Sequence, residues 1–153
     1  MATSIGEVCS RQVAYATRDM TVAGAAKLMR HHHVGSLVVV DQMNGSKRLP
    51  VGIVTDRDIV VELTATELDA GVITVGDIMS QELITARESE GLLEAMEIMH
   101  YKGVRRLPIV GADGELVGIV TIDDLLKVLA EQMSELARIV ARGQAREAAT
   151  RCR

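Results

Sequence analysis

The sequence predicts an α/β (α+β) fold made of two similar strand–helix–strand–strand–helix repeats, followed by an extended C-terminal helix. Internal repetition is the first observation behind this prediction. A shift of 70 residues places residues 5–10 on residues 75–80, and a shift of 66 places the run Val-Gly-Ile-Val-Thr at 51–55 on an identical run at 117–121. The change of offset falls in a turn, as a structural repeat tolerates.

The second observation is the order of hydrophobic periods within each repeat. Apolar residues recur first at helical spacing and then as short β-rich runs joined by the turn signals Asn44-Gly45 and Asp113-Gly114. The expected elements are strand 13–16, helix 22–29, strands 36–40 and 51–55 and helix 56–63 in the first repeat, and strand 83–86, helix 92–99, strands 107–110 and 117–121 and helix 122–129 in the second.

We expect the repeats to occupy residues 5–64 and 75–130, with a C-terminal helical extension at 131–153. A repeat of this size cannot bury enough surface alone, so the two should pack against each other. The extension carries apolar residues and an arginine every fourth position. It is interpreted either as a solvated helix or as a surface that docks a partner through Leu136, Ile139 and Val140.

Composition restricts the class of protein. The core must be aliphatic, because the chain has no Phe, no Trp and two Tyr. A net charge of -4 argues against a general nucleic-acid binder. Cys9 and Cys152 show no metal or disulfide spacing, and no long apolar run or targeting segment is apparent. We therefore expect a cytoplasmic protein without membrane contact.

Each copy of the repeated run ends in Thr-x-x-Asp, at Thr55 with Asp58 and at Thr121 with Asp124. One interpretation is a capping box, in which the threonine caps a helix and the acidic residue accepts from a free backbone N–H. The other is a ligand site, where the carboxylate accepts from a ribose diol and the helix start favours a phosphate.

Arginines distinguish the two repeats. Arg105 and Arg106 precede a buried strand in the second repeat, where the first has Gly35 and Ser36. Arginine pairs suit phosphate, although surface arginines at a strand edge are an equal interpretation. Arg57 gives the first Thr-x-x-Asp its own cation, so the sequence assigns Arg57 to one cleft and the arginine pair to the other.

Four histidines, His31, His32, His33 and His100, invite a metal-binding interpretation. Consecutive histidines at a helix end point in different directions and no other ligand stands at metal spacing, so we expect no metal site. No catalytic triad, P-loop or dinucleotide fingerprint is apparent. The sequence thus predicts neither an enzyme nor a catalytic cofactor.

The sequence resembles a tandem pair of cystathionine-β-synthase (CBS) domains, the Bateman module. The resemblance rests on Gly-Ile-Val-Thr-x-x-Asp in both repeats and on Arg-Arg-Leu-Pro-Ile-Val in the second, and it covers residues 5–129. It implies two repeats packed with pseudo-twofold symmetry around two clefts for adenosine ligands such as AMP, ADP, ATP or NAD. The first repeat departs from the pattern, since Leu37-Val38 replaces Leu-Pro and the arginine pair is missing.

The resemblance also implies site residues. The Thr-x-x-Asp residues would hold ribose, the residues before the second strand would meet phosphate or base, and backbone near the first strand would edge the adenine. The candidate ligand-binding residues are Ala14, Ser36, Thr55, Arg57, Asp58, Ile84, Arg105, Arg106, Pro108, Thr121 and Asp124.

The function expected from these residues is regulatory: a nucleotide sensor that changes shape or its affinity for an unidentified effector protein. Such modules usually form homodimers, as a flat disc of four repeats. The alternative is a scaffold that binds no ligand and docks a partner through its C-terminal helix.

Overall fold

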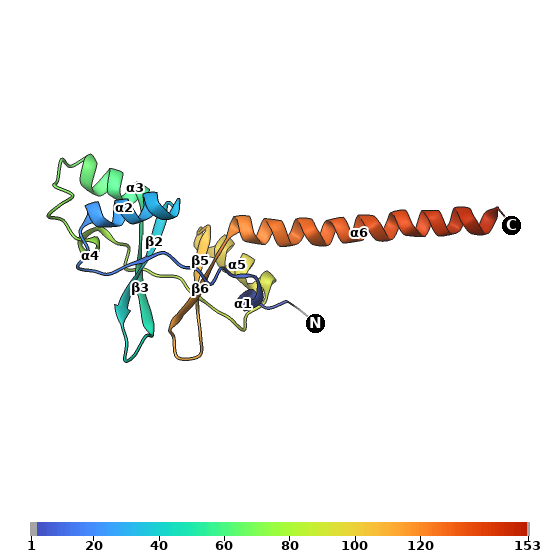
Figure 1. The fold of residues 1–153 in the computed structure, drawn as a ribbon, viewed down its shortest axis with the longest axis horizontal. Helices are drawn as coiled ribbons and strands as arrows, with labels where there is room; N and C mark the ends of the chain where they lie inside the picture. The colour runs from blue at the N-terminus through green and yellow to red at the C-terminus, as the bar shows by residue number, and fades with distance from the viewer. Residues whose placement is uncertain (1–2, 153) are drawn as a thin grey trace.

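The computed structural model describes residues 3–152 and shows two three-stranded sheets side by side, with one long helix projecting away from them (Figure 1). The strand order is β1-β2-β3 in one sheet and β4-β5-β6 in the other. In each sheet the first strand runs parallel to the central strand, and the third runs antiparallel to it. This arrangement confirms the predicted fold class.

Both repeats contain the expected order of main elements. In the first repeat these are β1 (Tyr15–Ala16), α2 (Val22–His32), β2 (Ser36–Gln42), β3 (Arg48–Thr55), α3 (Asp56–Asp58) and the π-helix η1 (Ile59–Thr64). In the second they are β4 (Ala86–Arg87), α5 (Leu92–Lys102), β5 (Arg106–Val110), β6 (Leu116–Thr121) and α6 (Ile122–Arg151).

Two short helices, α1 (Ile5–Val8) and α4 (Val75–Ile78), were missed by the sequence analysis. The backbone N–H of Ser4 donates to the Glu7 carboxylate at 3.1 Å, and that of Thr74 donates to the Asp77 carboxylate at 2.9 Å. Ser-x-x-Glu and Thr-x-x-Asp are helix-start signals, so the sequence did hold the information. The opening strands, in contrast, are shorter than predicted and begin later.

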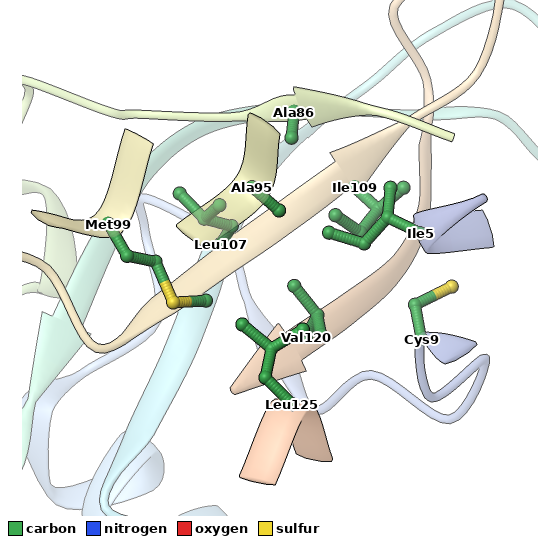
Figure 2. Packing of buried hydrophobic residues seen from close by; sticks show 9 residues of the cluster. All are labelled: Ile5, Cys9, Ala86, Ala95, Met99, Leu107, Ile109, Val120 and Leu125. Carbon is green, nitrogen blue, oxygen red and sulfur yellow. The ribbon is translucent and has the colours of Figure 1, made fainter. Parts of the chain in front are cut away.

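Each short helix packs in the core of the other repeat. Ile5 and Cys9 join the buried cluster of the second repeat, where Figure 2 shows Ile5 beside Ile109. Val75 and Met79 join the cluster of the first repeat. The two repeats therefore interlock, and neither has a complete core without a segment from the other.

The segment after each short helix crosses the third strand of the other repeat. Ser80 exchanges two backbone hydrogen bonds with Ile53 of β3, at 2.9 and 3.2 Å. Ser10 does the same with Ile119 of β6, at 2.9 and 3.0 Å. These crossings bring the residues that follow Ser80 and Ser10 past the ends of β3 and β6, where the two Thr-x-x-Asp junctions lie.

The long helix α6 begins at Ile122, directly after its N-cap Thr121, and continues far beyond the packed repeats. Leu125 is buried against the second repeat, whereas residues 129–152 are exposed. Figure 1 shows this part extending from the sheets without a neighbouring element. Within residues 3–152, none of the helices combines the length and apolar character needed to cross a membrane.

Candidate functional site: a cleft between the repeats

Both Thr-x-x-Asp junctions form capping boxes. The Asp58 carboxylate accepts from the backbone N–H of Thr55 at 2.8 Å, and the Thr55 hydroxyl accepts from the backbone N–H of Asp58 at 3.1 Å. The Asp124 carboxylate accepts from the backbone N–H and the hydroxyl of Thr121, at 2.9 and 2.8 Å. The capping interpretation is thus confirmed, and the ribose role stays a prediction.

Each junction is hydrogen-bonded to the residue that directly precedes the central strand of its own repeat. The backbone N–H of Asp56 donates to the Gly35 carbonyl at 3.0 Å, and that of Ile122 donates to the Arg105 carbonyl at 2.9 Å. Strand register places Ser36 opposite Thr55 and Arg106 opposite Thr121. The candidate residues of each repeat are therefore neighbours along one sheet edge.

A cavity of about 420 Å³ lies between the first and second repeats. Its size is within the range of small-molecule sites. It brings candidate residues of both repeats together: Thr55 and Arg57 from the first, and Ile84, Arg105, Arg106 and Pro108 from the second. The remaining lining residues are Ile53, Glu82, Leu83, Gly103 and Val104.

The structure corrects the assignment of the arginines to separate clefts. Arg57 lines the same cavity as Arg105 and Arg106. The cause is the crossing at Ser80 and Ile53, which carries the start of the second repeat past the end of β3. A sequence repeat reveals equivalent positions, but it does not reveal which copies of those positions share a cavity.

The lining of this cavity combines charge with apolar surface. Three arginines face one acidic residue, Glu82, so the cavity has a positive balance that favours an anionic ligand. Apolar side chains supply most of the remaining lining, from Ile53, Leu83, Ile84, Val104 and Pro108. No aromatic residue is among them, as the composition predicted.

Pro108 changes the hydrogen bonding at the cavity edge. In the first repeat the backbone N–H of Val38 donates to the Ala14 carbonyl at 3.2 Å. Pro108 occupies the position equivalent to Val38, and proline has no N–H to donate. Among residues 3–152, none donates a hydrogen bond to the Ile84 carbonyl. This carbonyl is therefore an available acceptor beside the cavity.

The pseudo-equivalent hollow is smaller and lacks arginine. It has a volume of about 350 Å³ and is lined by Gln12, Val13, Ala14, His32 and Val34. Ala14 is thus placed at the first-repeat hollow, with its carbonyl already paired to Val38. The two hollows thus differ in their charged lining residues, and the expectation that the two sites differ in ligand or affinity stays a prediction.

Four candidate residues line neither hollow. Asp58 and Asp124 are half-buried at their capping boxes, while Ser36 and Thr121 lie in the strand ends beside them. Five lining residues were in turn absent from the candidate set: Ile53, Glu82, Leu83, Gly103 and Val104. The repeated segments 10–14 and 80–84 are the signal that could have pointed to Glu82 and Leu83.

The other hollows and reactive side chains of the described residues are less suited to binding an anionic ligand or a metal. A hollow of about 600 Å³ over α5 is lined by Glu90, Glu94, Glu97, Ile98, Tyr101 and Lys102, and its three carboxylates oppose phosphate. Burial raises the pKa of the Cys9 thiol, which keeps it protonated in the core. In the described part of the chain, no cluster of three or more metal-ligating side chains occurs.

Comparisons with known proteins agree with this architecture. The family model described as "CBS domain" matches residues 5–65 and 75–131. An uncharacterised protein of Methanopyrus kandleri is 41% identical to this chain. The match covers 82% of this chain and 62% of that relative's length. The CBS domain-containing protein YhcV of Bacillus subtilis is 38% identical, over 80% of this chain and 82% of its own.

A solved structure extends the comparison to a ligand complex. The CBS domain pair of protein MJ0100, in complex with 5′-methylthioadenosine and S-adenosyl-L-methionine, superimposes with a TM-score of 0.73 at 26% identity. The match covers 86% of this chain and 99% of that one. Two interlocked repeats, two matches to one family model and this shared fold lead to one conclusion: the chain belongs to the CBS domain family and contains a tandem CBS pair.

Proposed function

We propose that this protein is a regulatory sensor that binds an adenine nucleotide in the 420 Å³ cavity between its repeats. The observation that carries the proposal is the combination of an open backbone acceptor at Ile84 with three arginines on the same cavity. A carbonyl can accept from the adenine amino group, and guanidinium groups can hold phosphate. An adenosine ligand in the related MJ0100 pair supports the choice of adenine.

The arginines favour a phosphorylated ligand over an uncharged or cationic adenosine derivative. Arg57, Arg105 and Arg106 would pair with phosphate oxygens in a partly desolvated cavity, where charge-assisted hydrogen bonds are strong. We therefore propose AMP, ADP, ATP or NAD as ligands. Thr55, which lines the cavity and is hydrogen-bonded to Asp58, would meet the ribose.

Ligand binding would act on the arrangement of the repeats. The cavity walls come from both repeats, so a ligand that contacts both favours the arrangement in which they fit it best. We propose that this shift alters the affinity of a cytoplasmic homodimer for an effector protein, and that the module regulates and does not catalyse.

Titration calorimetry with AMP, ATP and NAD tests this function. We expect binding by the parent protein and a loss of about tenfold or more in the Arg105→Ala variant, because a hydrogen bond to a charged group contributes about 1.5–3 kcal/mol. Arg30→Ala is the matched control, since Arg30 lies on α2 outside the cavity lining. Absence of binding by all three nucleotides contradicts the proposal.

A second candidate, a scaffold without a ligand, is favoured by the capping boxes themselves. In each box the threonine and the aspartate satisfy one another through hydrogen bonds, so a structural role accounts for both aspartates. The Asp58→Asn variant discriminates between the two functions. A scaffold predicts a lower melting temperature and no shift with nucleotide, whereas a sensor predicts a nucleotide-dependent rise that Asp58→Asn reduces.

A further inference from the structure

Within residues 3–152 of a single copy of the chain, the exposed part of α6 packs against no other element. Residues 129–152 extend about 36 Å and are exposed throughout. In proteins most helical stability comes from packing of an amphipathic face against another surface, and Gly143 in the interior weakens this helix. A stable helix here therefore requires a surface to cover one of its faces.

One face of α6 carries a regular apolar seam. Leu126, Leu129, Met133, Leu136 and Val140 follow one another at steps of three and four residues, and their exposed fractions are 56%, 37%, 70%, 63% and 59%. The next position in the pattern is Gly143. This three–four spacing is the seam of a coiled coil, whose residues interdigitate with a facing helix.

Charge along α6 is divided between its two halves. Residues 123–135 carry four carboxylates and one lysine, and residues 138–151 carry four arginines and one glutamate. A second copy in antiparallel orientation places each acidic half beside a basic half, and it also opposes the helix dipoles. A parallel pair would bring like charges together, at a cost.

Side-chain size along the seam favours the same orientation. In an antiparallel pair centred between Met133 and Leu136, Leu126 faces Gly143 of the partner subunit and Leu129 faces Val140 of the partner subunit. Large residues then oppose smaller ones and the seam is filled. A parallel pair would align Gly143 with Gly143 of the partner subunit and leave a void.

From this seam, its charge division and its size pattern, we propose that α6 binds a second copy of the chain as an antiparallel helix pair, with the two CBS pairs at opposite ends. The pairing joins two modules through surface that the nucleotide cavity does not use. It is independent of the proposed nucleotide binding, so either proposal can fail without the other.

Cysteine cross-linking tests the orientation. In a Cys152→Ser background, which removes the exposed thiol and leaves the buried Cys9, we would make Leu129→Cys and Val140→Cys separately. Antiparallel pairing predicts no disulfide dimer in either variant alone and a disulfide heterodimer after the two are mixed, allowed to exchange and oxidised. Dimers in each variant alone, or none in the mixture, overturn the proposal.

Mass in solution tests the surface itself. Leu136→Glu places a charge in the seam, and we expect it to halve the mass measured by sedimentation. Ser134→Glu adds the same charge outside the seam and should leave the mass unchanged. Since both positions are exposed, melting temperature serves to check that both variants remain folded. The proposal is overturned if the parent protein is a monomer, or if the mass of Leu136→Glu equals that of the parent. A monomeric parent that binds phosphatidylserine vesicles through its arginines would likewise overturn it.

Discussion

Gly52 in β3 and Ser80 in the crossing segment approach so closely that a Cβ atom on Gly52 would lie 2.7 Å from the Ser80 carbonyl oxygen. The pattern recurs at Gly118, whose Cβ would lie 2.9 Å from the Ser10 carbonyl oxygen. Neither glycine has a positive φ, so the requirement is for space. The glycine of each Gly-Ile-Val-Thr run thus permits the interlocking that builds the cavity.

The first prediction is that Gly52→Ala lowers the free energy of unfolding. The added methyl group meets backbone and the Met79 side chain, and overpacking of this kind costs about 1–3 kcal/mol. Urea denaturation measures the change. Gly71→Ala is the control, because the nearest neighbour of its Cβ is the movable Asp69 carboxylate at 3.3 Å. Equal free energies of unfolding in Gly52→Ala and the parent would contradict the close approach of the Ser80 backbone to Gly52.

The second prediction concerns Pro108. Pro108→Val restores the N–H that Val38 provides in the first repeat, and this N–H should pair with the Ile84 carbonyl as Val38 pairs with Ala14. We expect a stability equal to or above that of the parent, because a ladder hydrogen bond is gained. Nucleotide affinity should fall, because the adenine acceptor is then occupied. Calorimetry and thermal melting on the same samples separate the two effects.

If Pro108→Val binds nucleotide as tightly as the parent, the Ile84 carbonyl is not the adenine acceptor. Leu107→Val, at the buried neighbouring position, is the control for a change of side chain alone. It should reduce stability slightly through lost packing and leave nucleotide affinity in place.

The third prediction is a pH dependence at the cap of α4. The Thr74 backbone N–H and hydroxyl both donate to the Asp77 carboxylate, and these bonds hold the pKa of Asp77 below its ordinary value of 3.8. The ionised form is thus favoured by folding. Its contribution is complete above the ordinary pKa and is lost as the pH falls through the lowered one.

Comparison of the parent with Asp77→Asn across this range isolates the contribution. At neutral pH the variant should melt at a lower temperature, and the difference between the two proteins should shrink below about pH 4. A difference that stays constant down to acid pH would assign the loss to something other than the Asp77 charge.

Local structure was predictable from this sequence because repetition and hydrophobic period report on it directly. The repeated Val-Gly-Ile-Val-Thr run located β3, β6 and both caps, and helical spacing located α2 and α5. The short helix α1 was recognisable from Ser4 and Glu7 and was missed because four residues give no period. The π-helical η1 has no sequence signal distinct from an α-helix.

The assembly of the cavity was not predictable, because it depends on which repeat each crossing segment joins. Ser10 and Ser80 carry no signal for pairing with Ile119 and Ile53 in place of a strand in their own repeat. Because of this pairing between repeats, Arg57 lines the same cavity as Arg105 and Arg106 of the second repeat. The sequence repeat identifies the equivalent positions of the two repeats, but it does not identify which of these positions line the same cavity.

The fourth prediction follows from that pairing between repeats: Arg57→Ala and Arg105→Ala should weaken one and the same binding event. Because both side chains line a single cavity, each variant should lower the affinity for ATP by about tenfold to a hundredfold. The double variant should lose less than the product of the two, since both arginines meet one phosphate chain. Arginines in separate clefts would instead give two binding phases, with a different phase lost in each single variant. Calorimetric isotherms of the parent, both single variants and the double variant distinguish the two arrangements, with Arg30→Ala as the control for loss of a surface charge.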